Sequence, residues 1–384
     1  MNPTKPIVAH INHSFFALSE TFIYHYISRL RRFTPLCLGW KFCNPHLYKT
    51  QKQDMYSLAL PWAVLDYAYQ WVIRRLLRID PWAEFCAARV LRQRNASLVH
   101  AHFGWNGSFA VKLKRECKIP VITTWYGQDL SVRLSIKRFA SRYKILFEEG
   151  DLFLVEGPSM RQKLINLGCP EKKIQVQRIA LPLTEIPFRV RKQKKAGERV
   201  IFIFCGRFIE KKGLLFALQA LDRVRSKFSN FEFRIIGHGP QYNEIVNFIQ
   251  SHKMEKFVKM IGLLRYDNYL MEMLQADIFL HPSVTAANGD SEGGAPTTIL
   301  EAQATGMPVI SSYHADIPSV VVPDKSALLS PERDIDMLAL NIACLLDHQD
   351  LWPDMSFAGR EFVETNHHLE KEVVRLEDRY TSLL

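Results

Sequence analysis

An acidic, glycine-rich loop precedes an expected helix in the second half of the chain. The loop contains Asp290, Glu292, Gly293, Gly294 and Ala295. Pro296 is predicted to be the first residue of the helix, because a proline there has no N–H group to leave unpaired. The backbone N–H groups of Thr297 and Thr298 then lack partners inside the helix, and the helix dipole adds positive potential at the same end. Such a helix start is suited to binding a phosphate or a diphosphate.

Two carboxylates beside a phosphate site indicate that a hydroxyl-rich group binds next to the anion. Glu292 precedes the expected helix, and Glu301 lies within it before a predicted helix end at Gly306. A carboxylate repels a phosphate, but it accepts hydrogen bonds from the hydroxyl groups of a ribose or a hexose. A nucleotide-sugar contains a diphosphate and both kinds of ring, so the segment predicts a nucleotide-sugar site.

Two cations follow the first predicted strand of the second half. Arg207 and Lys212 are five residues apart in a strand-to-helix turn, where both could reach one diphosphate. Charge-assisted hydrogen bonds of this type contribute about 1.5–3 kcal/mol each. The alternative is a solvated turn with ordinary surface cations. After the next strand, Gly237 and Gly239 predict a tight turn and not a dinucleotide fingerprint, which needs a third glycine.

Polar residues also end predicted strands in the first half. His102 stands at the end of one strand, and Tyr126, Gly127 and Asp129 stand just after another. A single histidine is more often a packing residue, but two such segments at strand ends point to a ligand crevice.

Short apolar segments alternate with helical patterns along the whole chain. The predicted strands are 7–12, 98–103, 121–126, 152–155 and 174–179 in the first half, and 200–205, 231–236, 258–261, 278–281, 309–312 and 327–329 in the second. Helical patterns include 214–228, 242–251 and 338–346. This alternation predicts an α/β fold with two parallel sheets, each covered by helices on both faces. A proline-containing, basic linker is expected at 181–197, and the ligand crevice is expected where the carboxyl ends of the strands face each other.

Length and charge are consistent with two domains, the first of them basic. The 384 residues exceed what one core usually holds. Residues 1–185 hold 27 Lys and Arg against 13 Asp and Glu, a balance of +14, and residues 186–384 hold 23 against 26, a balance of −3. The first half is therefore expected to face an anionic membrane surface or a nucleic acid. No basic module with interleaved aromatic residues is recognised, so we expect no nucleic-acid partner.

The cysteines and the apolar segments indicate in which cellular compartment the protein is expected. The seven cysteines form no C-x-x-C pair and no signal peptide is seen, which indicates a reduced, cytoplasmic setting. The apolar stretch 58–73 is 16 residues long and contains Asp66, so it is too short and too polar to cross a bilayer. A helical apolar stripe begins in this stretch at Trp62 and continues past its end to Leu76, with arginines from Arg74 onward. The stripe could lie on anionic lipid or pack on the first sheet. No D-x-D cluster directly after a predicted strand and no His/Cys ligand spacing is seen, so neither a metal nor another cofactor is expected.

The segment from Glu301 to Val309 resembles the donor-binding signature of retaining GT-B glycosyltransferases of family 4, also called group 1, the colanic-acid and exopolysaccharide type. The family signature continues from its second glutamate as Ala-x-Ala-x-Gly-x-Pro-Val, which this segment matches. Its two glutamates are separated by seven residues, whereas Glu292 and Glu301 are separated by eight, which we interpret as an insertion after Glu292. The Gly-Arg and Lys-Gly pairs of the 206–213 turn, Gly-x-Gly-Pro at 237–240, Ile-Gly at 261–262 and His-Pro-Ser at 281–283 complete a resemblance that covers almost all of residues 200–320.

The first half resembles the same family at three places. The segment 100–103 matches His-Ala-His-Phe, and 124–129 matches Thr-x-His-Gly-x-Asp except that Tyr126 replaces the histidine. The exchange affects any role that needs an imidazole there, but not a role of the Tyr126 backbone carbonyl. Ser-Glu-Thr-Phe at 19–22 resembles a segment beside the active site of polysaccharide-assembly members. A helix start with Ser19 as N-cap and Glu20 in the first turn would explain that segment equally well.

The resemblance implies a fold and a role for each candidate residue. The fold would be GT-B, with two Rossmann-like domains facing across a cleft: an acceptor domain of residues 1–185, completed by a crossover helix at about 366–384, and a donor domain of residues 186–365. The residues implied to act in catalysis are Glu292, Arg207, Lys212 and His102. The donor would be bound by Arg207, Lys212, Gly237, Gly239, Glu292, Gly293, Gly294, Ala295, Pro296, Thr297, Thr298 and Glu301, with Glu301 on the ribose and Glu292 on the transferred sugar. The acceptor would be bound by Ser19, Glu20, His102, Tyr126, Gly127 and Asp129.

The resemblance also implies the reaction. A hexose-type sugar would pass from a nucleotide donor, with UDP-sugars preferred, to a hydroxyl of a saccharide acceptor, with retention at the anomeric carbon and no metal. A lipid-linked acceptor in bacterial surface polysaccharide assembly, held at the inner face of the cell membrane, would suit the basic first half. The alternatives are a GDP-mannose-dependent mannosyltransferase and a non-catalytic carbohydrate-binding relative. The second is motivated by Tyr126 and by the longer spacing between the glutamates.

Overall fold

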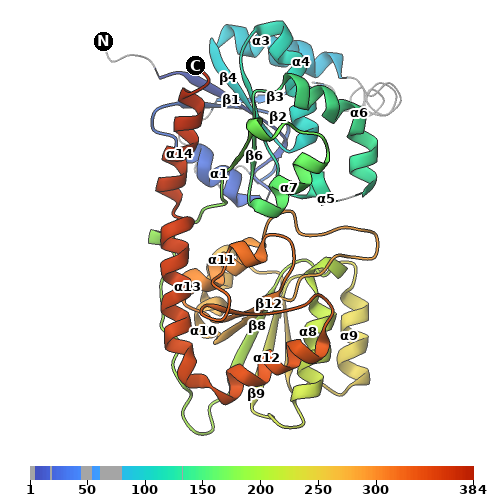
Figure 1. Ribbon diagram of the computed structural model, residues 1–384, viewed down its shortest axis with the longest axis vertical. Helices are drawn as coiled ribbons and strands as arrows, with labels where there is room; N and C mark the ends of the chain where they lie inside the picture. The colour runs from blue at the N-terminus through green and yellow to red at the C-terminus, as the bar shows by residue number, and fades with distance from the viewer. Residues whose placement is uncertain (1–4, 18–19, 45–53, 61–79, 132) are drawn as a thin grey trace.

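Two parallel sheets form the two halves of the molecule, one above the other in Figure 1. The computed structural model describes residues 5–17, 20–44, 54–60, 80–131 and 133–384. Every strand pair within these residues is parallel, and the strand orders are β3-β2-β1-β4-β5-β6-β7 and β10-β9-β8-β11-β12-β13. The predicted α/β fold with two helix-covered parallel sheets is confirmed.

The first half is built around the seven-stranded sheet. Its strands are β1 (Ile7–Phe15), β2 (Thr34–Phe42), β3 (Asp54–Ser57), β4 (Ala96–His102), β5 (Val121–Thr124), β6 (Leu152–Val155) and β7 (Ile174–Val176). Its helices are α1 (Thr21–Ser28), α3 (Pro81–Gln93), α4 (Gly104–Cys117), α5 (Gln128–Ser131), α6 (Arg133–Glu149) and α7 (Pro158–Asn166). The sequence analysis did not predict β2 and β3. Pro35 and Gly39 are unusual inside a strand, and Gly39 is required because a side chain there would meet the ring of Phe15 at 2.8 Å.

The second half is built around the six-stranded sheet. Its strands are β8 (Val200–Cys205), β9 (Phe231–Ile236), β10 (Val258–Gly262), β11 (Ile278–Leu280), β12 (Val309–Ser312) and β13 (Ala327–Ser330). Its helices are α8 (Leu214–Val224), α9 (Tyr242–Ser251), α10 (Tyr266–Gln275), α11 (Thr297–Thr305), α12 (Ile335–Asp347) and α13 (Trp352–Asn366). Apart from the edge strand β10, the strands are short, largely buried apolar segments, as expected for a parallel sheet covered on both faces.

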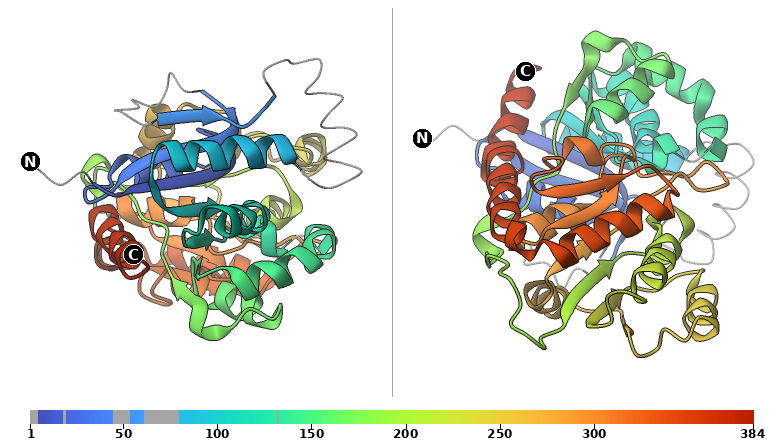
Figure 2. Two further views of the ribbon diagram at one scale, coloured as in Figure 1. Left: turned by 90° about the horizontal axis from the view of Figure 1, so that it is seen from above. Right: turned by 60° about the horizontal axis from the view of Figure 1, so that its bottom comes forward.

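The chain crosses between the halves twice. After β7 it passes through 177–199, where the buried guanidinium of Arg191 donates to the carbonyl oxygens of Met273 at 2.7 Å and Ala276 at 3.0 Å. The basic segment is therefore only partly solvated, because the hydrogen bonds of Arg191 attach it to the second half. After α13 the chain returns as α14 (Leu369–Thr381), whose Leu369, Val373 and Tyr380 are buried against the first sheet. Figures 1 and 2 show α13 and α14 running along one side of both halves.

Candidate functional site

The loop after β11 brings the first predicted acid into the crevice between the halves. Glu292 is buried, and its Oε1 lies 2.9 Å from the Lys212 ammonium. The Ser283 hydroxyl donates to the same oxygen at 3.3 Å. Burial by itself would raise the pKa of Glu292, but Lys212 and Lys211 outweigh it and hold the pKa at about 2. Glu292 is therefore an ionised carboxylate paired with Lys212, a residue predicted to bind the diphosphate.

A second set of contacts fixes the backbone of this loop. The Glu292 N–H donates to His314 Nε2 at 2.9 Å, and the other ring nitrogen of His314 lies 2.6 Å from Glu332 Oε1. Lys211 is buried and donates to Asp290 Oδ1 at 3.1 Å and to the Ser291 carbonyl at 3.0 Å. Lys211 thus holds the loop, which leaves its neighbour Lys212 as the cation that faces Glu292.

Arg207 lies on the turn after β8 with its side chain exposed, and no described residue forms an ion pair with it. Two glycines in the loop after β9 are required because that loop packs closely against the turn after β8. A side chain at Gly237, where φ is +140°, would meet the Gly206 carbonyl at 1.9 Å, and one at Gly239 would meet the Phe208 carbonyl at 2.6 Å. The predicted tight turn at Gly237 and Gly239 therefore allows two loops to pack backbone against backbone.

Helix α11 begins one residue later than predicted. Pro296 has φ −57° and ψ 127°, so it is the N-cap, and Thr297 is the first helical residue. The expectation of Pro296 inside the helix is wrong because its ψ is extended. The hydroxyl of Thr298 is buried and has no partner among the described residues. The helix ends as predicted at Gly306, whose φ of 87° is the left-handed value that glycine adopts without strain.

Glu301 is placed by a residue that the sequence analysis missed. The Tyr269 hydroxyl on α10 donates to Glu301 Oε2 at 2.6 Å. Burial raises the pKa of Glu301 to about 7, although this hydrogen bond lowers it. The Cys205 thiol at the end of β8 has its pKa raised to about 12 by burial and by Glu301, and lowered by Lys212. Glu301 and Lys212 therefore both lie near the carboxyl end of β8.

The 126–129 turn of the first half is held by one carboxylate. Asp129 is fully buried and accepts hydrogen bonds from the backbone N–H of Gly104 at 2.7 Å, of Gly127 at 2.9 Å and of Tyr126 at 3.3 Å. Burial raises the pKa of Asp129 to about 6 against the lowering effect of these bonds. Its carboxylate thus shapes the turn, and the predicted contact with an acceptor stays a prediction.

His102 and Glu20 lie behind this turn. His102 is buried, with Nδ1 2.8 Å from the Tyr126 hydroxyl and Nε2 3.1 Å from His10 Nδ1. Glu20 is the N-cap residue of α1 and not part of its first turn, so that expectation is wrong; its carboxylate accepts from Asn12 at 3.2 Å. Ser19 and the basic stripe that begins at Trp62 lie outside the described residues.

The two halves meet through glycines of the predicted loops. A side chain at Gly293 would meet the Gly127 Cα at 1.9 Å, and one at Gly127 would meet the Gly293 Cα at 2.1 Å. A side chain at Gly294 would meet Glu156 Oε2 at 1.9 Å. The two predicted segments, more than 150 residues apart in the sequence, are therefore in backbone contact across the crevice.

Two further carboxyl groups at this contact were missed by the sequence analysis. Asp316 of the second half accepts from the backbone N–H of Ser159 at 2.6 Å and of Met160 at 3.2 Å, and so caps helix α7 of the first half. Glu156 follows β6 and is buried. Burial, then Asp316, Asp129 and Glu292, raise the pKa of Glu156 well above its usual range. Each acid follows a strand, which was the available signal, but neither stands in a recognisable motif.

A metal can be tested against the described residues. His10, His100 and His102 are the group whose ligand atoms come closest, within 4.8 Å of one another. Both nitrogens of His100 already have partners, Tyr380 and Thr124, each at 2.6 Å. His10 and His102 are hydrogen-bonded to each other, and the ring of His100 packs against both. Sequence spacing did not reveal this group because His10 comes from β1. No helix in the described ranges is both long and apolar enough to cross a membrane.

The chain matches known proteins along most of its length. Residues 186–362 match the family model described as Glycosyl transferases group 1, and residues 43–178 match Glycosyltransferase Family 4. It is 35% identical to the colanic acid biosynthesis glycosyltransferase WcaL of Escherichia coli strain K12 over 73% of this chain and 69% of that protein. It is 33% identical to the amylovoran biosynthesis glycosyltransferase AmsK of Erwinia amylovora over 71% and 68%.

Solved structures agree on the fold. The chain superposes on Anabaena Alr3699/HepE in complex with UDP with a TM-score of 0.78 at 13% identity, covering 98% of this chain and 100% of that one. At such identity the similarity concerns the GT-B fold, while the relatives above carry the family. This protein belongs to the family 4, group 1, glycosyltransferases.

Proposed function

We propose that this protein transfers a hexose-type sugar from a UDP-sugar to a hydroxyl of a lipid-linked saccharide, with retention at the anomeric carbon and without a metal, in the assembly of a bacterial surface polysaccharide. The relatives named for colanic acid and amylovoran biosynthesis support the polysaccharide role. The superposed structure of HepE in complex with UDP supports the choice of base.

One observation carries the proposal. Lys212, ionised Glu292 and the ribose candidate Glu301 lie around the carboxyl end of β8, beside the start of α11. A cation and unpaired helix amides suit a diphosphate, and carboxylates suit the hydroxyls on either side of it.

The same residues would stabilise the leaving group. As the sugar–phosphate bond breaks, negative charge grows on the diphosphate, and Arg207, Lys212 and the amides of Thr297 and Thr298 would hold it. Arg207 is exposed and pairs with no described residue, so no ion pair has to break before it binds a phosphate. Lys212 would turn from Glu292 to the phosphate, which frees Glu292 to accept hydrogen bonds from the transferred sugar.

The acceptor would lie on the first half. His102, Tyr126 and Gly127 stand at the carboxyl ends of β4 and β5, opposite the donor loop. The balance of +14 over residues 1–185 would favour an acceptor presented at an anionic membrane, and a peripheral position on its inner face.

Thermal-shift titration with UDP, GDP and ADP, each with EDTA and then with Mg²⁺, tests the donor. A ligand that binds only the folded state stabilises it by about 2.7 kcal/mol at a hundred times its dissociation constant. We expect UDP to raise the melting temperature in EDTA. A shift with GDP alone would support the mannosyltransferase alternative, and no shift with any nucleotide would support the non-catalytic carbohydrate-binding alternative.

A transfer assay tests the reaction itself. UDP-glucose and UDP-galactose would be incubated with lipid-linked saccharides, and the anomeric configuration of the product measured by NMR. An α product from these α-linked donors is expected, and a β product would refute retention.

A further inference from the structure

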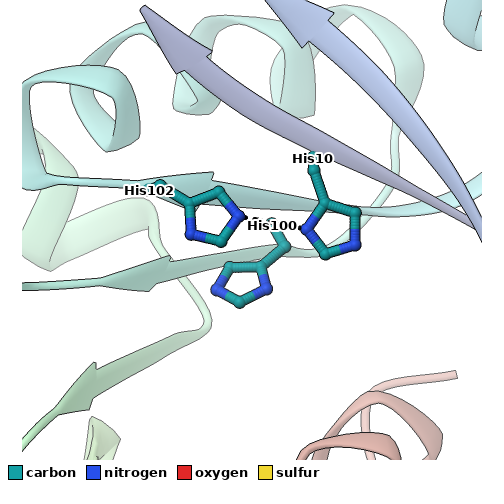
Figure 3. A group of neighbouring side chains, drawn as sticks. All are labelled: His10, His100 and His102. Atoms are coloured by element: carbon teal, nitrogen blue, oxygen red, sulfur yellow. Dashed lines mark hydrogen bonds between the residues drawn. The ribbon is translucent and has the colours of Figure 1, made fainter. Parts of the chain in front are cut away.

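A chain of three side chains leads from the first sheet to the crevice. His10 on β1 and His102 on β4 face each other, with His10 Nδ1 3.1 Å from His102 Nε2 (Figure 3). The second nitrogen of His102 lies 2.8 Å from the Tyr126 hydroxyl. His10 was not among the predicted site residues, and its position behind His102 raises the question of which way the hydrogen bonds run.

Both imidazoles are neutral. Burial lowers the pKa of His10 and of His102 well below 6.5, and the neighbouring His100 lowers both further. A neutral imidazole has one N–H group, so a single hydrogen lies between His10 Nδ1 and His102 Nε2. If His102 donates it, the N–H of His10 must be on Nε2. If His10 donates it, the N–H of His102 must be on Nδ1, where it points at the Tyr126 oxygen.

The far nitrogen of His10 decides between these two arrangements. His10 Nε2 is buried and has no hydrogen-bond partner in the part of the chain that the structure describes. An orphaned buried N–H is rarer in proteins than an acceptor with an unused lone pair. The arrangement that leaves only a lone pair on His10 Nε2 is therefore favoured. In it His10 donates to His102, and His102 donates to Tyr126.

The Tyr126 oxygen then accepts a hydrogen bond and has its own proton left to donate. Burial, then the Glu156 carboxyl, raise the pKa of Tyr126 well above its usual value, so the phenol keeps this proton. The Thr124 hydroxyl is also near and can accept the hydrogen bond that the phenol donates. Two contacts place Tyr126 beside the donor loop: its backbone carbonyl faces Gly293, and the neighbouring Glu156 carboxyl lies against Gly294.

We propose that His10 and His102 are positioning residues that orient the Tyr126 phenol to donate a hydrogen bond to an oxygen atom of a sugar substrate in the crevice. This inference rests on the proposed glycosyl transfer. The oxygen is a hydroxyl or phosphate oxygen of either the donor or the acceptor, and kinetics can distinguish these two sources.

A spectroscopic test does not depend on activity. Long-range ¹H–¹⁵N correlation spectra of protein labelled with ¹⁵N-histidine report which ring nitrogen carries the hydrogen, and His10→Asn and His102→Asn assign the signals. We expect the Nδ1–H form for both His10 and His102. An Nε2–H form of His102 would overturn the proposal, even if the enzyme transfers sugar as proposed.

Kinetics test the consequence for turnover. Tyr126→Phe keeps the ring that packs on Phe22 and Phe103, and removes only the hydroxyl. We expect kcat/KM to fall about tenfold, the size of one neutral hydrogen bond. The substrate whose KM rises identifies the source of the oxygen. The matched control Tyr56→Phe removes a hydroxyl on β3 and should leave kcat/KM unchanged; a tenfold loss there, or none in Tyr126→Phe, would overturn the proposal.

His10 variants separate positioning from simple packing. His10→Leu removes the Nδ1 donor and should cost about as much as Tyr126→Phe, whereas His10→Asn retains an N–H near that position and should recover most of the lost rate. Because His10 acts through Tyr126, the double variant His10→Leu/Tyr126→Phe should be no slower than either single variant. Losses that multiply, or no rescue by His10→Asn at equal melting temperature, would overturn the proposal.

A metal on the three histidines is the competing use of the group. Metal analysis of the purified protein, followed by titration with Zn²⁺, tests it directly. One bound equivalent that is lost in His10→Leu would overturn the proposal, and no binding above the background of His10→Leu is the expected result.

Discussion

Replacing Gly293 by alanine should separate the two halves while leaving each of them folded. The new Cβ would lie 1.9 Å from the Gly127 Cα and 2.8 Å from the Tyr126 carbonyl oxygen. Non-bonded carbon atoms prefer about 3.5–4.0 Å, so the loops must move apart by about 2 Å. Both neighbours are backbone atoms, which cannot move aside by a change of rotamer. The crevice could then no longer close to the distance that the structure shows.

The expected effect is on transfer and not on nucleotide binding. Misplacing reacting groups by about 1 Å can cost about 100-fold in rate, so kcat/KM of Gly293→Ala should fall by at least this factor. The predicted contacts to the nucleotide come from the second half alone, and the melting-temperature shift with UDP should therefore remain. The two measurements together distinguish blocked closure from a damaged donor site.

Gly289→Ala is the matched control in the same loop. Its φ of +83° makes alanine strained by about 1–2 kcal/mol, but nothing lies within 4 Å of the added atom. It should lose some stability and keep its transfer rate. Wild-type transfer by Gly293→Ala, or an equal loss in Gly289→Ala, would refute the argument that contact between Gly293 and Gly127 is the closed state used in transfer.

Three further predictions concern the charged groups. Arg207→Ala should lower the rate of transfer about 10- to 100-fold and leave the melting temperature unchanged, because no described residue pairs with Arg207. Lys212→Ala should lower both the rate of transfer and the melting temperature, because buried Glu292 loses its ion-pair partner. Burial raises the pKa of Glu301 from 4.5 to about 7, so the contribution of Glu301 to folding stability should decline as the pH rises between these values. Isothermal titration should show UDP binding more tightly at pH 8 than at pH 6, because the ionised carboxylate is the better acceptor for ribose hydroxyls. Glu301→Gln should abolish this pH dependence. Asp316→Ala removes the cap of α7 that the second half supplies, which should cost about 1 kcal/mol of stability. The donor KM should rise several-fold, and the melting shift caused by UDP should not change. An unchanged KM would count against closure by this contact.

The sequence was sufficient for the second sheet but not for the first. Strands such as β8 and β9 are continuous apolar segments between turns, a pattern that buried parallel strands produce. β2 contains Pro35 and Gly39, which local propensity disfavours, and it forms because packing on β1 outweighs that propensity. The start of α11 was displaced by one residue because backbone dihedrals, and not residue type, decide whether Pro296 is inside the helix.

The site residues that sequence reasoning missed act through tertiary contacts. Tyr269 bonds to Glu301 from a different helix, His10 reaches His102 from a neighbouring strand, and Asp316 caps a helix of the other half. None stands in a motif, because their roles depend on which segments the fold places side by side. Motifs pointed to loops that the fold brings together, such as those of Gly127 and Gly293, and the structure was needed to find the residues that contact them from other elements.

The pairing of Lys212 with Glu292 resolves a conflict within the proposed donor site. A carboxylate next to a diphosphate is unfavourable, yet a carboxylate is the strongest acceptor for sugar hydroxyls. In the structure Lys212 neutralises Glu292, whose pKa is held at about 2 despite burial. A donor that brings both a diphosphate and a hydroxyl-bearing ring satisfies both partners at once, whereas a nucleotide without its sugar would attract Lys212 and leave Glu292 buried and unpaired. If the proposed donor site is right, the Lys212 ammonium makes binding depend on the sugar. The intact UDP-sugar should then bind more tightly than UDP in wild type but not in Glu292→Gln.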